Sequence, residues 1–115
     1  VRHIEMHRKI DVTTPDSSKF VELYNIVSES VNNDNDELED ALPLGDIVAA
    51  CVANPDGYGW QIEGVDGYIP PDTLTWTELQ TGYWLLDSQK TWFLNENYQS
   101  GRYKVRDLKA IKAIQ

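Results

Sequence analysis

The residues best placed to do chemistry are five carboxylates that stand close together before the middle of the chain. They are Asp34, Asp36, Glu37, Glu39 and Asp40. A run of this kind could bind calcium, but an EF-hand loop needs glycine at its sixth position and glutamate at its twelfth. Counted from Asp34, the sixth residue is Glu39 and the twelfth is Gly45. We therefore predict no calcium site and interpret the run as a solvated acidic segment that is open to a binding partner.

Two histidines near the N-terminus form a second candidate. His3, Glu5 and His7 follow one another at every second position, which places all three on one face of a strand. Three such ligands could hold zinc or nickel. The alternative is an ordinary polar strand face, and because the sequence shows no fourth ligand we predict no metal. Neither histidine has a serine or cysteine at a spacing typical of a catalytic triad.

Cys51 is the only cysteine in the chain, so it can form no internal disulfide. Its apolar neighbours between Val48 and Val52 predict a small buried residue and not a reactive thiol, which needs accessible electropositive surroundings. A chain without disulfides suits the cytoplasm, where we expect this protein. The sequence has no glycine-lysine phosphate loop and no dinucleotide fingerprint. We therefore expect no cofactor and name no catalytic residue.

Aromatic residues are the second large group. Four tryptophans and five tyrosines lie between residues 58 and 103, and most of them must fill the core of so small a domain. The stretches 83–86 and 91–94 are nevertheless apolar on both alternating faces. A helix of this chain, a partner or a second copy could cover the outer face. Because tryptophan is enriched at interface hot spots, we predict Trp84 and Trp92 as partner-binding residues and leave a homodimer open.

The 115-residue chain has a net charge of −9, and its acidic residues are unevenly placed. Residues 20–89 contain 14 acidic residues and no lysine or arginine, whereas residues 90–115 carry six cations and two acids. So acidic a chain does not suit a nucleic acid backbone or an anionic membrane surface, and no apolar run has the length of a membrane span. We expect a basic protein or peptide as partner. The alternative is that the basic ends fold back on the acidic middle.

Periodicity in the first third of the chain predicts a strand and a helix. Polar and apolar residues alternate before residue 12, as they do in a half-buried strand. Thr14 and Pro15 suit the start of a helix, and apolar residues at helical spacing run from Phe20 to Val31. We therefore predict a strand over 1–12, a helix over 15–31 and an acidic loop over 32–46.

The remaining sequence indicates antiparallel strands. The apolar run 47–53 favours a buried strand, although a helix stays open, and residues 87–90 fit the loop of a hairpin. We predict mainly antiparallel structure over 47–106 and a short helical closing segment over 107–115. The whole chain is then a single α+β domain, in which an N-terminal strand and one amphipathic helix pack on an antiparallel sheet.

The stretch 44–70 resembles the core of an SH3 domain. An acidic segment precedes a Gly-Asp pair, a strand with a tryptophan and the sequence Gly-Tyr-Ile-Pro, in the order that this family shows over roughly residues 34–79. The resemblance implies a small SH3-like barrel with a groove for proline-rich peptides. It implies that Trp60 or Tyr58 takes the family's tryptophan position and Pro70 its proline position, with Tyr68 beside them.

These observations lead to one functional hypothesis with two alternatives. We predict a non-catalytic binding protein that presents carboxylates around aromatic side chains to a basic partner, in the manner of a small inhibitor or immunity protein. The alternatives are an SH3-like module for a peptide or small ligand, and a small enzyme without a recognisable motif. The predicted partner-binding residues are Asp34, Asp36, Glu37, Glu39, Asp40, Tyr58, Trp60, Tyr68, Pro70, Trp84 and Trp92.

Overall fold

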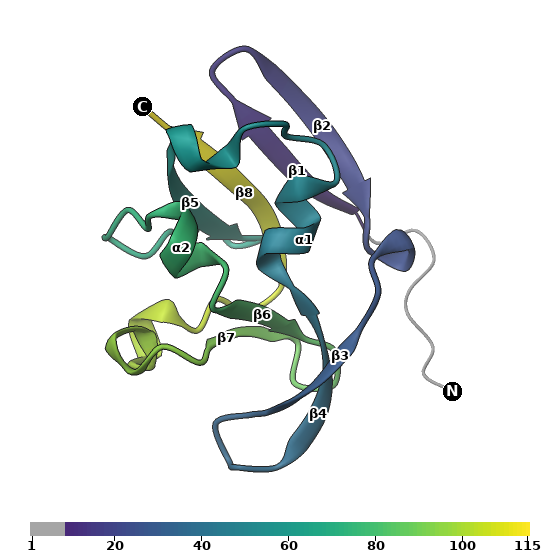
Figure 1. Cartoon of the computed structure of the whole chain (residues 1–115). Coiled ribbons are helices and arrows are strands. Elements are labelled where there is room, and N and C mark those ends of the chain that lie inside the picture. Colours follow the sequence, from purple (N-terminus) through teal and green to yellow (C-terminus); the bar gives the residue numbers. More distant parts are fainter. Residues whose placement is uncertain (1–8) are drawn as a thin grey trace.

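The structure is a computed structural model that describes residues 9–115 (Figure 1). Two four-stranded sheets have the strand orders β2-β1-β8-β5 and β3-β4-β6-β7, and every pairing is antiparallel except that of β1 with β8. The helices are α1 (Leu44–Ala49) and α2 (Trp76–Leu79). The strands are β1 (Lys9–Thr14), β2 (Ser17–Glu22), β3 (Glu29–Asn32), β4 (Leu38–Pro43), β5 (Gly59–Gly64), β6 (Gly82–Leu85), β7 (Lys90–Phe93) and β8 (Leu108–Ile114).

The predicted α+β class is confirmed, although strands provide most of the regular structure. The two sheets share no strand among residues 9–115 and do not close into a single barrel. Within the same residues, no helix combines the length and the apolar character that a bilayer span requires.

The predicted helix over 15–31 is wrong. Pro15 and Asp16 form the turn of a hairpin, and β1 pairs with β2 along the full length of both strands. The Thr14 hydroxyl accepts hydrogen bonds from the backbone N–H groups of Asp16 and Ser17. The side chain that could cap a helix therefore holds this turn, and the apolar residues that follow are divided between exposed and buried positions.

Only the end of the predicted N-terminal strand falls within the described residues, where it forms β1. The metal-site candidates His3, Glu5 and His7 lie outside the described residues.

Helix α1 stands where the sequence predicts the end of an acidic loop and the start of a buried strand. Pro43 precedes the helix in an extended conformation. Leu44, Ile47 and Val48 follow at the spacing of one helical face, and all three are buried. Because β4 occupies residues 38–43, only residues 33–37 remain as an acidic turn between β3 and β4.

Strand β8 stands where the sequence predicts a closing helix. It lies between β1 and β5, and Leu108, Ala110 and Ile111 are all buried. Leu108, Ile111 and Ile114 are spaced by three, which also fits a helix, but pairing with β1 on one side and β5 on the other makes the segment a strand. By contrast, β5 confirms the predicted strand around Trp60, and β6 with β7 confirms the predicted hairpin.

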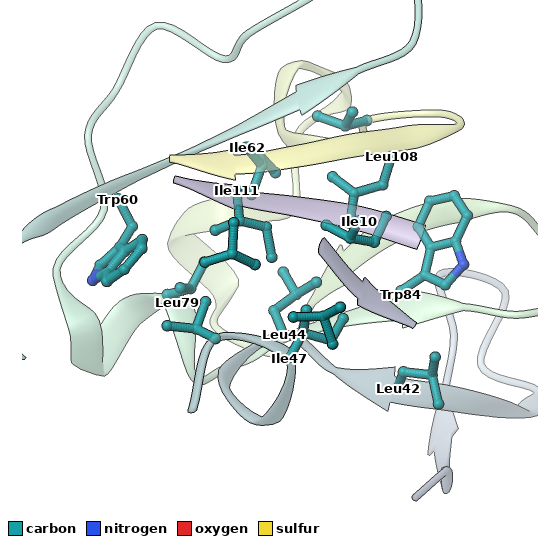
Figure 2. Packing of buried hydrophobic residues seen from close by; sticks show 14 of the residues in the cluster. Ile10, Leu42, Leu44, Ile47, Trp60, Ile62, Leu79, Trp84, Leu108 and Ile111 are labelled. Carbon is teal, nitrogen blue, oxygen red and sulfur yellow. The ribbon is translucent and has the colours of Figure 1, made fainter. Parts of the chain in front are cut away.

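The main core lies between the two sheets, with α1 and α2 packed into it (Figure 2). Trp60 and Trp84 are among its largest fully buried side chains. The labelled members of this core are Ile10, Leu42, Leu44, Ile47, Trp60, Ile62, Leu79, Trp84, Leu108 and Ile111.

A second, smaller cluster lies on the opposite face of the sheet that contains β6. Its members are Val31, Ala41, Leu85 and Trp92. The Trp92 indole N–H donates to the Asn32 carbonyl oxygen at 3.0 Å, so β3 and β7, the two edge strands, approach each other over this cluster. Both faces of β6 are thus covered by the chain itself. Trp84 and Trp92 are buried, which corrects their prediction as partner-binding residues.

Candidate functional site

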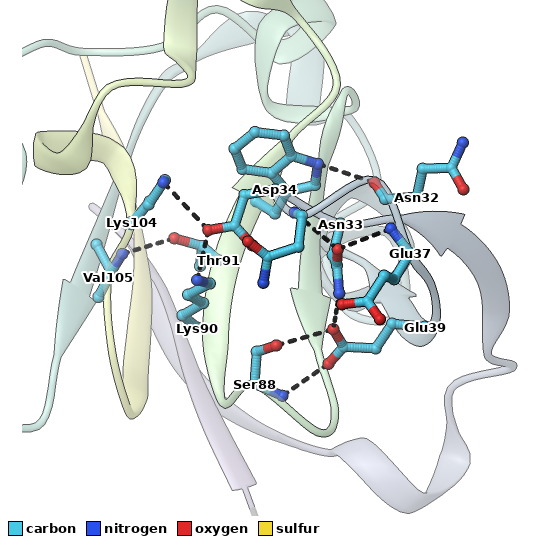
Figure 3. Close-up of polar contacts among 12 residues, drawn as sticks. Asn32, Asn33, Asp34, Glu37, Glu39, Ser88, Lys90, Thr91, Lys104 and Val105 are labelled. Carbon is cyan, nitrogen blue, oxygen red and sulfur yellow. Dashed lines mark hydrogen bonds and ion pairs between the residues drawn. The ribbon is translucent and has the colours of Figure 1, made fainter.

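Asp34 stands at the start of the β3–β4 turn and binds two lysines from distant parts of the chain (Figure 3). Its Oδ2 atom lies 2.6 Å from the Lys90 Nζ atom and 3.2 Å from the Lys104 Nζ atom. The hydrogen bond from Lys90, supported by Lys104, holds the pKa of the Asp34 carboxyl below its usual value. Lys104 also lies over the ring of Trp92, at 5.4 Å from its centroid. Asp34 is therefore bonded within the fold, through a lysine that packs on Trp92 of the second cluster. Its carboxylate is not available to a partner.

Glu39 is the second acid of the run that the fold uses internally. It is only 7% exposed. Its Oε1 atom accepts from the Asn33 amide and the Ser88 hydroxyl, and its Oε2 atom accepts from the backbone N–H groups of Asp87 and Ser88. Burial alone would raise the pKa of Glu39, but these hydrogen bonds together lower it. The carboxylate thus fastens the β3–β4 turn to the β6–β7 turn.

The turn directs two of the other acids of the run, Asp36 and Glu37, outward. The Asn33 side chain accepts the backbone N–H groups of Asn35 and Glu37, and Asp36 adopts the left-handed conformation that tight turns need. Asp36 and Glu37 are exposed. Asp40 is half-buried in β4 and accepts a long hydrogen bond, at 3.4 Å, from the Ser30 hydroxyl.

The two fastened turns form an acidic end of the molecule, which we define as Asp36, Glu37, Leu38 and Asp87. Leu38 is 75% exposed, and Asp87 is exposed on the neighbouring turn. A shallow hollow lies between the turns. It is lined by Asn33, Asn35, Glu37, Leu38, Glu39, Asp87 and Ser88. This end offers carboxylates around one apolar side chain.

The residues of the SH3-like prediction do not form an open groove. Trp60 is fully buried and donates its indole N–H to the Pro55 carbonyl oxygen at 2.9 Å. Pro70 is buried and Tyr58 is half-buried. Tyr68 is partly exposed, and its hydroxyl donates to a backbone carbonyl oxygen at 2.8 Å. The prediction of Trp60 and Pro70 as ligand-binding residues is therefore corrected, because neither side chain reaches the surface.

The fold also uses carboxylates that the sequence did not single out. The Tyr98 hydroxyl donates to Glu78 at 2.5 Å, and this hydrogen bond raises the pKa of Tyr98 to about 12. The Tyr103 hydroxyl donates to Asp72, and the two tyrosine rings pack edge to face with centroids 4.9 Å apart. No spacing in the sequence indicates these pairs, because each joins residues at least 20 positions apart.

The alternative in which basic residues fold back on the acidic middle is confirmed for part of the charge. Lys90 and Lys104 bind Asp34, and Lys112 binds Glu63 at 2.6 Å.

Cys51 is half-buried, and burial raises the pKa of its thiol. Among residues 9–115, no three histidine, cysteine, aspartate or glutamate side chains gather as a metal site requires.

The acidic end is thus defined by contacts within this chain. Comparisons with protein-family models, with curated proteins and with solved structures found no match.

Proposed function

We propose that this protein is a non-catalytic binding protein whose acidic end recognises a basic protein or peptide. One observation carries the proposal. The acids near the two turns fall into two groups, of which Asp34 and Glu39 are bonded inside the fold. Asp36 and Glu37 stay exposed beside Leu38. The bonds of Asp34 and Glu39 hold the turn that carries the exposed Asp36 and Glu37.

The charge around the acidic end supports a basic partner. Lys90 and Lys104 both bond to the half-buried Asp34 carboxylate, so these two cations pair with Asp34 and not with the exposed acids. Complementary charge speeds encounter and orients the partner. The exposed Leu38 side chain, which lines the hollow between the turns, supplies apolar contact on the same surface.

The geometry favours this proposal over an SH3-like peptide module. A groove for a proline-rich peptide needs exposed aromatic rings on which the peptide packs. The Trp60 ring is fully buried, and its indole N–H is already bonded to the Pro55 carbonyl oxygen.

Neutralising the exposed acids tests the proposal. The double variant Asp36→Asn/Glu37→Gln removes two exposed charges from the acidic end and leaves the bonds of Asp34 and Glu39 in place. We expect it to bind a decalysine peptide about fivefold more weakly at low ionic strength, and to lose much of the salt dependence of binding. Isothermal calorimetry at two salt concentrations measures both effects.

A matched control separates a local site from bulk charge. Asp56→Asn/Glu96→Gln makes the same change in net charge at exposed positions outside the two turns. We expect less than a twofold change in affinity for this variant. Equal weakening by both double variants would mean that only net charge matters, and the proposed site would be abandoned.

A further inference from the structure

The outer edge of β3 presents backbone groups that point away from its sheet. Among the described residues, β3 lies at the margin of the sheet and pairs only with β4. The Asn33 N–H donates to the Glu37 carbonyl oxygen at 2.9 Å, and antiparallel neighbours are bonded at every second residue pair. The backbone groups of Val31 therefore point to β4, and those of Ser30 and Asn32 point outward.

Most of these outward groups have no partner. The Asn32 carbonyl oxygen accepts the Trp92 indole N–H. Within residues 9–115, no hydrogen bond engages the N–H groups of Ser30 and Asn32 or the Ser30 carbonyl oxygen, and both residues are exposed. By contrast, the outer edges of β5 and β7 are bonded to Leu74 and Val105. An edge with unpaired backbone groups can accept a further strand.

The hairpin that β3 forms with β4 is acidic throughout. Residues 29–43 contain six acidic residues and no lysine or arginine. The acids are Glu29, Asp34, Asp36, Glu37, Glu39 and Asp40. Lys90 and Lys104 both bond to Asp34, and Glu39 is bonded inside the fold. In the part of the chain that the structure describes, the other four acids take part in no ion pair, so the hairpin attracts a basic segment.

Exposed acids stand at both ends of the open edge. Glu29 is the first residue of β3 and is exposed. Burial raises the pKa of Tyr83, and the Glu29 carboxylate adds to this effect, so it lies beside that tyrosine. A carboxylate accepts several hydrogen bonds, and this one can also bind a cation. Asp36 and Glu37 are exposed in the turn beyond the other end of β3.

The charges also argue against other occupants and other edges. The outer edge of β2 is likewise unbonded within residues 9–115, but Lys9 and Lys19 offset Glu22 there, so its charges select no partner. A second copy does not suit β3. Two such edges side by side would bring the Glu29 carboxylates and the turn acids of both copies together, and like charges across paired strands are destabilising.

We propose that the basic partner binds along the outer edge of β3 as an extended segment of a protein, with lysine or arginine on both sides of the residues that pair with β3. Backbone groups of the segment bond to Ser30 and Asn32. Its cations reach Glu29 at one end and Asp36 with Glu37 at the other. This inference rests on the function proposed above and adds how the partner is held.

A pair of synthetic peptides tests the strand pairing. The first has four threonines between two lysines on each side, and the second is the same peptide with all four threonine nitrogens methylated. Methylation keeps the charge and removes the N–H groups that a strand needs. We expect the first peptide to bind about tenfold more tightly at the same salt concentration, and to slow hydrogen exchange of the Ser30 and Asn32 amides. Equal affinity of the two peptides would overturn the inference.

Two variants of one residue test the same pairing from the side of the protein. Ser30→Pro removes an outward N–H group, a position at which edge strands tolerate proline. We expect it to weaken binding of the first peptide about tenfold. Ser30→Ala keeps the N–H and loses only the hydroxyl that donates to Asp40; it should change the affinity less than twofold. Circular dichroism checks the fold of both variants, and the methylated peptide needs no change in the protein.

Three outcomes separate this inference from the proposed function. If Asp36→Asn/Glu37→Gln weakens both peptides while methylation has no effect, the acidic end binds a basic partner but β3 does not pair with it. If neither peptide binds at low ionic strength, both proposals are wrong. If sedimentation shows that the free protein self-associates, and Ser30→Pro abolishes that association, the occupant of the edge is a second copy.

Discussion

Neighbouring carboxylates in the acidic run differ in role because of what surrounds them. Glu37 and Glu39 are two residues apart, yet Glu37 is exposed and Glu39 accepts four hydrogen bonds inside the fold. When a buried donor loses its acceptor, the fold is destabilised by about the free energy needed to desolvate that donor. Removing one of these acids should therefore destabilise the protein, and removing the other should not.

Glu39→Ala should lower the free energy of unfolding by about 3 kcal/mol, because the Asn33 amide and the N–H groups of Asp87 and Ser88 lose their acceptor. Glu37→Ala, on the exposed side of the same turn, should change it by less than about 0.5 kcal/mol. Urea denaturation of both variants measures the difference. Equal stability of the two variants would show that Glu39 does not fasten the turns.

The sequence located the acidic run but not the roles of its members. Carboxylates in a polar stretch indicate a solvated segment, and that holds for Asp36 and Glu37. The internal role of Asp34 depends on Lys90 and Lys104, which lie 56 and 70 residues away. Such contacts exist only once β7 and the segment after it pack beside the turn, so no local pattern reveals them.

At the scale of elements, β6 packs so closely that it leaves no room for a side chain at its first residue. A Cβ atom added to Gly82 would lie 2.8 Å from the Leu44 Cδ1 atom of α1 and 2.5 Å from the Phe93 ring of β7. Both neighbours are fully buried. The glycine therefore sets the distance at which β6, β7 and α1 meet.

Gly82→Ala should lower the free energy of unfolding by about 2 kcal/mol, because an overpacked core must shift to admit the methyl group. Gly57→Ala is the matched control, since an added Cβ there meets nothing within 4 Å; its effect should stay below about 0.5 kcal/mol. Thermal and urea unfolding compare the two. A Gly82→Ala variant as stable as the parent protein would mean that this part of the core admits the methyl group without loss of stability.

Elements with local determinants were predictable from the sequence, and those with distant partners were not. The β6–β7 hairpin follows from its own turn residues and apolar flanks. The stretch after Thr14 is ambiguous, because threonine and proline suit a helix start and a hairpin turn alike. Whether this stretch forms a helix or a hairpin depends on β1. That strand pairs in parallel with β8 from the other end of the chain, with Asp11 opposite Ala110.

At the scale of the molecule, the basic C-terminal part offsets the acidic middle at only a few points. Lys90, Lys104 and Lys112 each bond to an acid from the first two thirds of the chain. The net charge remains −9, and the acidic end keeps the exposed carboxylates of Asp36 and Glu37. Folding thus concentrates the excess negative charge on surfaces and does not remove it.

This arrangement predicts a loss of stability in acid with a defined sign. The carboxyls of Asp34, Glu39 and Glu78 all have pKa values lowered by their partners in the folded state. Near pH 4 the unfolded chain therefore binds more protons than the folded one, so stability is full at neutral pH and falls as the pH drops below the usual carboxyl range. Urea unfolding between about pH 7 and pH 2.5 should show this decline.

The variant Asp34→Asn measures how much the Asp34 carboxyl contributes to this loss of stability in acid. It should be less stable at pH 7, because Lys90 and Lys104 lose a charged acceptor. Its stability should also fall less steeply in acid, since one of the depressed pKa values is gone. Asp56→Asn, at an exposed acid, should keep the slope of the parent protein. Parallel curves for Asp34→Asn and the parent would mean that the two lysines do not hold the Asp34 carboxylate in its charged form.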